Sequence, residues 1–266
     1  MIGIFDSGFG GVSILREIRK AFPDYSILYL GDSARNPYGA KSPEQVRQMT
    51  YQGVRYLEAM GAQLIIIACN TACAHTLHSG GIPPVNVPVF DVIVPTALEA
   101  AQHTQGRIGV IATRSTINSH IYEEVLSSII AEHHDLRIIE QACPLFVPLI
   151  EEGWERHFCT RLIAEKYLKP LKGEDIDTLI LGCTHYPFLE RTIRSIMGSK
   201  VRIITSGLPV VNALRAYLLE SPEAEAALVK HGDVQYCATD NLDIWARFIR
   251  VHAPFPHTSI EKVSIG

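Results

Sequence analysis

Two segments of the chain share one pattern, in which a run of aliphatic residues ends at a cysteine and is followed by residues that favour the start of a helix. The segments are residues 64–71 (LIIIACNT) and 179–187 (LILGCTHYP). Nearly continuous aliphatic runs are typical of strands buried inside a parallel sheet. A thiol at the carboxyl end of such a strand, beside the first turn of a helix, is well placed to ionise. We therefore expect Cys69 and Cys183 to form an active site with two thiols.

These two segments belong to a longer internal repeat, because the elements around them recur in the same order and at similar spacing. The other matching pairs are residues 2–5 with 108–111, residues 27–30 with 136–139, and residues 87–95 with 201–209. This period is far too long for a solenoid. The repeat therefore predicts two similar α/β halves, each of which contributes one thiol, with a boundary near residue 95.

Strand patterns alternate with helical patterns along almost the whole chain, which is typical of βαβ units around parallel sheets. A helix over residues 43–60 is expected to open at Ser42 and Pro43, which occupy favoured cap and first-turn positions. Further helices are expected over residues 71–79 and 116–132. The predicted fold class is therefore α/β.

Charge and composition exclude several classes of function. The formal charge of -4 gives no basic surface for nucleic acid, so a small anionic substrate must be held by local donors. No apolar run is long enough to span a bilayer, and Met1 leads directly into a strand rather than a signal peptide. The six cysteines are scattered, without a CxxC pair, so we expect free thiols and a cytoplasmic protein.

Polar residues follow four of the predicted strands. In an open α/β sheet, ligands bind at the carboxyl ends of the strands. The residues found there are Asp6, Ser7 and Gly8; Asp32 and Ser33; Cys69, Asn70 and Thr71; and Cys183, Thr184 and His185. Each has a structural alternative as a helix cap, a turn residue or a buried small side chain. Their joint occurrence at four strand ends favours a site, because caps do not require thiols.

The sequence fits four other kinds of site less well than the two-thiol site. A dinucleotide site at Gly8–Gly11 lacks the G-x-G-x-x-G spacing, because position 13 is Ser. A zinc site needs ligands drawn from Cys69, Cys73, His75, Cys183 and His185, but Cys73 is expected on the buried side of its helix. A cysteine hydrolase leaves the second thiol unexplained. A dithiol redox site usually has a CxxC pair.

Two thiols on opposite sides of one carbon can invert its configuration without redox chemistry. One thiolate takes a proton from one face, and the other thiol returns a proton to the opposite face. Asp6 and His185 are candidate proton partners of the neighbouring thiols. Backbone N–H groups at the two helix starts are expected to bind the substrate carboxylate. No lysine lies at a strand end, so the sequence nominates no Schiff-base lysine for pyridoxal phosphate.

The chain resembles the cofactor-independent glutamate racemase family, within the aspartate/glutamate racemase superfamily. The segments that carry the resemblance are residues 4–11 (IFDSGFGG), 31–39 (GDSARNPYG), 68–72 (ACNTA), 143–153 (CPLFVPLIEEG) and 182–187 (GCTHYP). They cover the chain from residue 2 to about residue 206 in the family's order. The chain departs from the family's usual residues at Thr205-Ser206 and at residues 90–95, which are not catalytic positions.

The resemblance implies roles for particular residues. Cys69 and Cys183 are expected to be the catalytic bases, with Cys69 acting on the D-form, and Asp6, Asp32, Glu151 and His185 are expected to assist proton transfer. Substrate contacts are expected from Asp6, Ser7, Pro37, Tyr38, Gly39, Asn70, Thr71, Thr184 and His185. No metal and no cofactor are expected. The expected partner is glutamate, and a homodimer stays open.

The resemblance also implies a domain organisation and a biological role. Two doubly wound parallel-sheet domains related by pseudo-twofold symmetry are expected, with the active site in the cleft between them. Residues 1–95 with 206–266 would form the domain that carries Cys69, and residues 96–205 the domain that carries Cys183. The implied role is the supply of D-glutamate for peptidoglycan. The alternatives are a racemase for aspartate or another small acid, and a two-lobed ligand-binding module, which the paired thiols disfavour.

Overall fold

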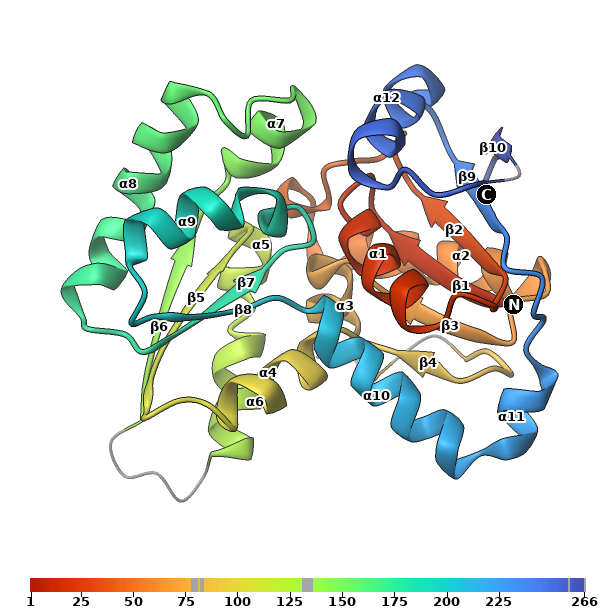
Figure 1. Ribbon diagram of the computed structural model, residues 1–266, viewed down its shortest axis with the longest axis horizontal. Helices are drawn as coiled ribbons and strands as arrows, with labels where there is room; N and C mark the ends of the chain where they lie inside the picture. Colours follow the sequence, from red (N-terminus) through yellow and green to blue (C-terminus); the bar gives the residue numbers. More distant parts are fainter. Residues whose placement is uncertain (78–80, 82–83, 131–135, 258, 266) are drawn as a thin grey trace.

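A computed structural model describes residues 1–77, 81, 84–130, 136–257 and 259–265, and shows two parallel β-sheets side by side, each surrounded by helices (Figure 1). The first sheet has the strand order β10-β9-β2-β1-β3-β4, and the second has the order β6-β5-β7-β8. All pairings within both sheets are parallel. The expected α/β class with two parallel sheets is confirmed.

The strands are short, and those inside the two sheets are mostly buried on both faces, which explains the aliphatic composition of these inner strands. Those of the first sheet are β1 (Ile2–Asp6), β2 (Ile27–Gly31), β3 (Leu64–Ile67), β4 (Val89–Phe90), β9 (Val234–Ala238) and β10 (Ser259–Lys262). Those of the second sheet are β5 (Arg107–Ala112), β6 (Arg137–Ala142), β7 (Thr178–Gly182) and β8 (Arg202–Ile204).

The internal repeat is visible in the topology. The order β2-β1-β3-β4 in the first sheet is the same as the order β6-β5-β7-β8 in the second. The cysteine segments follow equivalent central strands, β3 and β7. The first sheet is extended beyond β2 by β9 and β10, which come after the whole second sheet in the sequence.

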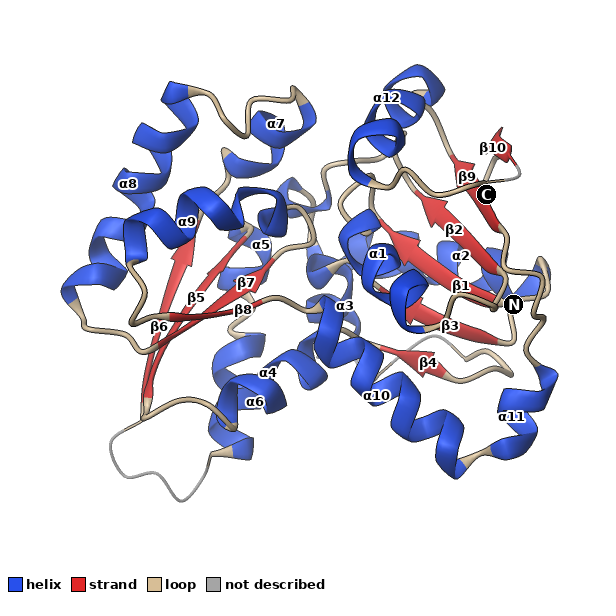
Figure 2. Ribbon diagram, in the orientation of Figure 1, coloured by secondary structure: helices blue, strands red, loops and turns tan. Residues whose placement is uncertain are grey.

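The helices lie around the two sheets (Figure 2). They are α1 (Val12–Ala21), α2 (Pro43–Ala59), α3 (Asn70–Leu77), α4 (Ile93–Ala101), α5 (Arg114–Asn118), α6 (Ile121–Ile129), α7 (Phe146–Glu151), α8 (Phe158–Gly173), α9 (Glu190–Met197), α10 (Gly207–Glu220), α11 (Pro222–Ala227) and α12 (Leu242–His252). Two short 3-10 helices are η1 (Tyr38–Ala40) and η2 (Tyr186–Leu189). None of the helices in the described ranges has the length and apolar character needed to cross a membrane.

The start of α2 agrees with the sequence-based expectation, whereas the helix expected over residues 116–132 does not. Ser42 and Gln45 form the expected capping box at the start of α2, with Gln45 N–H donating to Ser42 Oγ at 3.3 Å. The helix expected over 116–132 is instead two helices, α5 and α6. His120 lies between them in the left-handed region, with φ 55°, and interrupts the helical path. Residues 131–132 of that prediction, and residues 78–79 of the helix expected over 71–79, lie outside the described residues.

Two helices connect the sheets in a reciprocal way. Helix α4 follows the last strand of the first repeat and packs on α6, beside the second sheet. Helix α10 follows the last strand of the second repeat and packs on α1, beside the first sheet. The two helices also touch one another, so the connections between the units lie together at the junction (Figure 1).

Candidate active site

A small cavity lies at the junction of the two units, where the carboxyl ends of the central strands meet. About 20 Å³ of it can hold the centre of a water molecule, which is room for about one water. Its lining residues are Ser7, Asn36, Pro37, Tyr38, Gly39, Cys69, Asn70, Thr71, Thr113, Val147, Cys183, Thr184 and His185. Both thiols therefore border one cavity, one from each unit.

Cys69 lies just after β3, one residue before α3 begins, and is 5% exposed. Its thiol donates a hydrogen bond to Ser7 Oγ at 3.4 Å, and its sulfur accepts one from the Ala72 N–H at 3.5 Å. Burial, together with the nearby Asp6, raises the pKa of Cys69 to about 12, although the Ser7 and Ala72 hydrogen bonds work in the opposite direction. Cys69 is therefore a neutral thiol at neutral pH.

Cys183 lies just after β7 and is 6% exposed. His185 hydrogen-bonds to it, and His185 Nε2 lies 3.1 Å from Glu151 Oε1. Burial would lower the pKa of His185, but the hydrogen bonds and negative charges of Cys183 and Glu151 outweigh burial and raise that pKa to about 10. His185 is therefore an imidazolium at neutral pH, with both ring nitrogens as donors, and it places a positive charge beside the Cys183 sulfur.

Asp6 is fully buried at the end of β1 and connects the two units. Its Oδ1 accepts a hydrogen bond from Thr184 Oγ1 at 3.2 Å, and its Oδ2 accepts one from the Gly8 N–H at 2.9 Å. Burial raises the pKa of Asp6, and the charge of His185 acts against that rise. Asp6 thus fixes the Thr184 side chain at the wall of the cavity.

Asn70 presents an unpartnered donor at the cavity. Its Oδ1 accepts a hydrogen bond from Tyr122 OH at 2.6 Å, which sets the orientation of the amide. Its Nδ2 is buried and has no hydrogen-bond partner among the described residues. A buried amide without a partner costs free energy unless a ligand satisfies it, so Nδ2 is a candidate donor to a substrate carboxylate.

Threonines join the units on the other side of the cavity. Thr71 Oγ1 lies 2.9 Å from Thr113 Oγ1 and 3.0 Å from Thr116 Oγ1. Thr71 lies in the first turn of α3 in the first unit, whereas Thr113 caps α5 in the second. The hydroxyls therefore hold the two units together beside the site.

The glycine segment that follows β1 permits a close approach between the units. A Cβ on Gly10 would overlap the His185 ring and the Thr184 hydroxyl. A Cβ on Gly39 would lie 2.9 Å from Thr113 Cβ. The segment Gly8–Gly11, weighed in the sequence as a dinucleotide loop, thus lies directly against the Cys183 loop.

The predicted site residues fall into two groups. Ten of them are among the lining residues given above; Asp6, Asp32 and Glu151 are not. Asp32 is fully buried behind Tyr38, accepting hydrogen bonds from Tyr38 OH at 2.5 Å and Arg35 Nε at 2.6 Å. Asp6, Asp32 and Glu151 therefore lie behind the lining and are joined to it by hydrogen bonds to Thr184, Tyr38 and His185, respectively.

Three lining residues were not proposed from the sequence. Thr113 follows β5 as Ser7 follows β1, so the internal repeat could have identified it. Asn36 lies inside the segment 31–39 and donates to Glu151 Oε1 at 2.9 Å across the junction. Val147 is an apolar residue of α7 that no sequence signal distinguished.

The ligand set weighed for zinc is not gathered in the structure. In the described ranges, the group whose ligand atoms lie close enough to share an ion is His120, Glu123 and Glu140, away from the thiols. The Cys73 thiol donates to Ile67 O at 3.2 Å, and His75 Nε2 lies 2.7 Å from Ser115 Oγ.

Comparisons with known proteins agree with this arrangement. The family model of Asp/Glu/hydantoin racemases matches residues 10–220. A glutamate racemase of Geobacter metallireducens is 41% identical over 251 residues, covering 94% of this chain and 90% of the relative. The chain belongs to the glutamate racemase family.

Other members of the glutamate racemase family support the assignment. A glutamate racemase of Chlorobaculum parvum is 39% identical over 272 residues, covering 99% of this chain and 95% of the relative. The crystal structure of one from Bacillus anthracis matches with a TM-score of 0.89 and 33% identity, covering 100% of this chain and 97% of that one. The crystal structure of one from Francisella tularensis, in complex with D-glutamate, matches with a TM-score of 0.86 and 31% identity, covering 99% of this chain and 97% of that one. The protein is therefore an isomerase of the amino-acid racemase type.

Proposed function

We propose that the protein interconverts L-glutamate and D-glutamate by proton transfer between Cα and two thiols, Cys69 and Cys183, without a cofactor. The observation that carries this proposal is that two buried thiols, from equivalent strands of the two units, border one cavity. The glutamate racemases related to this chain, and the D-glutamate complex of the Francisella protein, support the choice of substrate.

The two thiols have different surroundings. The imidazolium of His185 lies beside the Cys183 sulfur, whereas burial raises the pKa of Cys69 and keeps it protonated. With L-glutamate bound, the Cys183 thiolate takes the Cα proton, and the electron pair of the C–H bond moves onto the substrate carboxyl group. The Cys69 thiol then gives its proton to the opposite face. This leaves a Cys183 thiol and a Cys69 thiolate, which is the form that acts on D-glutamate.

The charge that develops on the substrate carboxyl group needs donors, because a Cα proton is far less acidic than a thiol. Racemisation at useful rates requires the barrier to fall by roughly 8–23 kcal/mol. Fixed donors in a water-poor site supply much of such a reduction. We assign this role to the unpartnered Asn70 Nδ2, with Ser7 and Thr184 as further polar groups at the cavity.

We place this activity in the cytoplasm and assign it to the supply of D-glutamate for peptidoglycan. All six cysteines are free thiols, and reduced thiols persist in the cytosol. A homodimer stays a prediction.

The test is hydrogen exchange at Cα. Metal-free protein incubated with L-glutamate in D₂O should yield D-glutamate that carries deuterium at Cα. Exchange with aspartate but not with glutamate would assign the enzyme to another small acid. Tight binding of glutamate without exchange would point to a binding module and contradict the proposal.

A further inference from the structure

A second, larger pocket opens next to the active-site cavity. It has a volume of about 580 Å³, measured as for the 20 Å³ cavity, which is ample for a small ligand. Its lining residues are Gly39, Ala40, Lys41, Pro43, His75, Arg114, Ser115, Asn118 and Pro144. They come from both units, so this outer pocket lies at the same junction as the thiols.

The two pockets are neighbours, because the same two segments, residues 37–41 and 113–115, line both of them. Residues 37–39 line the inner cavity and residues 39–41 the outer pocket, with Gly39 common to both. On the other side, Thr113 lines the inner cavity, and the next residue, Arg114, lines the outer pocket. The backbone of Gly39 passes so close to Thr113 that a Cβ on Gly39 would be 2.9 Å from Thr113 Cβ. Gly39 and Thr113 therefore form a neck between the pockets.

The lining of the outer pocket carries positive charge and no carboxylate. Lys41 is half-buried and Arg114 is exposed, and neither pairs with an acidic side chain within the described ranges. Some other cations of the described surface do pair with carboxylates, as Lys230 does with Glu225 and Arg194 with Glu190. Lys41 and Arg114 therefore place positive charge without a neutralising carboxylate at the mouth of the site, in a chain with a formal charge of -4.

We propose that the outer pocket is an entrance that captures the dicarboxylate substrate through Lys41 and Arg114 before it passes the neck. The inference rests on the proposed function, because it takes glutamate as the ligand. A net negative protein repels an anionic substrate at long range, and a local patch of cations overcomes that repulsion. Lys41 and Arg114 are positioning residues, since they lie outside the cavity that contains the thiols.

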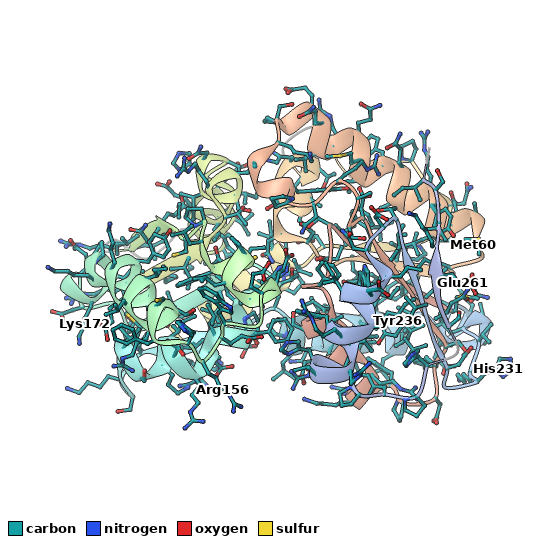
Figure 3. All side chains as sticks on the ribbon, turned by 90° about the horizontal axis from the view of Figure 1, so that it is seen from above. Met60, Arg156, Lys172, His231, Tyr236 and Glu261 are labelled. Carbon is teal, nitrogen blue, oxygen red and sulfur yellow. The ribbon has the colours of Figure 1, made fainter. Side chains whose placement is uncertain are left out.

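The experiment compares the double variant Lys41→Gln/Arg114→Gln with a matched control, Lys172→Gln/Lys200→Gln. The control removes the same charge from a pocket of the second unit, far from the junction, and Lys172 lies at the outer end of that unit (Figure 3). Initial rates with both glutamate enantiomers are measured at about 10 mM and about 500 mM salt, where charges act over roughly 30 Å and 4 Å.

At low salt we expect kcat/KM of the entrance variant to fall about fourfold through a higher KM, with kcat unchanged. At high salt the difference from the parent protein should vanish, and the control should follow the parent throughout. Equal KM values for entrance variant and parent at low salt would overturn the proposal. So would a fall in kcat, or the same fall in the control.

Failure of the proposed function would be recognised separately, because the parent protein would then not exchange Cα hydrogen of glutamate. Calorimetric titration with glutarate, a dicarboxylate without an amino group, would still show whether the outer pocket captures dicarboxylates. Weaker binding of glutarate by the entrance variant at low salt, but not by the control, supports capture of dicarboxylates. Binding equal to that of the parent contradicts it. Titration with inorganic phosphate shows whether the pocket prefers a phosphate; tighter binding of phosphate than of glutarate would overturn the proposal.

Discussion

The two thiols occupy equivalent positions of the internal repeat, but their neighbouring side chains differ. Cys69 faces a serine hydroxyl and lies near the buried Asp6, whereas Cys183 faces an imidazolium that Glu151 holds in place. The positions equivalent to Thr184 and His185 are Asn70 and Thr71, so the second half of the repeat gained a cation that the first half lacks. The two thiols of the proposed mechanism therefore have different electrostatic surroundings, with a positive charge beside Cys183 and a buried carboxyl group near Cys69.

Replacing either thiol should stop racemisation in both directions, since each direction needs one thiol as base and the other as acid. We expect Cys69→Ala and Cys183→Ala to lower kcat by roughly 10²–10⁴-fold, as loss of a general acid or base does. Circular dichroism during racemisation of each enantiomer measures the effect. Cys159→Ala is the control because Cys159 is exposed, and near-normal turnover by Cys183→Ala would show the two-base assignment to be wrong.

Glu151→Gln should weaken the support for the His185 imidazolium. The pKa of His185 then falls from about 10, and the alkaline limb of kcat/KM moves to lower pH. Glu152→Gln, at the exposed neighbouring position, should leave the profile in place. An unchanged alkaline limb in Glu151→Gln would separate His185 from the chemistry.

The same residue predicts the dependence of stability on pH. The pKa of His185 is raised by folding from 6.5 to about 10, so its contribution to stability is complete below about pH 6.5 and is lost as the pH rises towards 10. Denaturant unfolding at a series of pH values should show the free energy of unfolding decline across this window. In His185→Gln the decline should be smaller, and an equal decline in both proteins would assign it to other groups.

At the scale of elements, the glycine turn between β1 and α1 decides how closely the units approach. Gly10→Ala should push the Cys183 loop away, because its Cβ overlaps the His185 ring and the Thr184 hydroxyl. Misplacement of a catalytic group by about 1 Å costs roughly 100-fold in rate, and overpacking costs roughly 1–3 kcal/mol of stability. Kinetics and thermal unfolding measure the two effects.

Gly173→Ala is the matched control for that substitution. Gly173 ends α8, and a Cβ there would meet no atom within 4 Å. Activity should be unchanged and stability equal or higher by about 0.5–1 kcal/mol, because Ala restricts the unfolded chain. If Gly10→Ala behaved like Gly173→Ala, the close approach would not matter for catalysis.

Sequence patterns predicted the elements whose burial is uniform and missed those set by distant contacts. Strands such as β3 and β7 are buried on both faces, so their aliphatic runs identify them. The break between α5 and α6 depends on His120 in a left-handed conformation that histidine seldom adopts, and nothing local announces it. In the site, the thiols and their neighbours were predictable from strand ends, whereas Val147 reaches the cavity only through the tertiary fold.

At the scale of the whole molecule, the proposed site is a narrow cavity between the two units. About one water fits in the cavity, and both catalytic thiols are nearly buried. We expect that glutamate passes Gly39 and Thr113 only when the two units move apart there, while α4 and α10 connect the units and touch one another. We propose that the moving bodies are residues 1–95 with 206–266 and residues 96–205, because the strands of each sheet fall within one of these groups.

Thiol modification tests this opening. In a Cys159→Ser background, which removes the exposed thiol, a thiol reagent should modify Cys69 and Cys183 slowly, and saturating glutamate should slow both further. Mass spectrometry of peptides gives the rate at each cysteine. Cys237, buried away from the cavity, is the internal reference, and protection of Cys237 equal to that of the catalytic thiols would indicate general stabilisation instead of closure around a ligand.

Strand β9 lies beside β2, and β10 lies beside β9, although the whole second sheet is encoded between these two strands and the first four. A ribosome therefore releases β1 to β4 long before the strand that covers the edge of β2, and the nascent chain carries an uncovered β-edge through most of its synthesis. Uncovered strand edges are prone to pair with other chains, so the first sheet is open to wrong pairing until β9 has been synthesised.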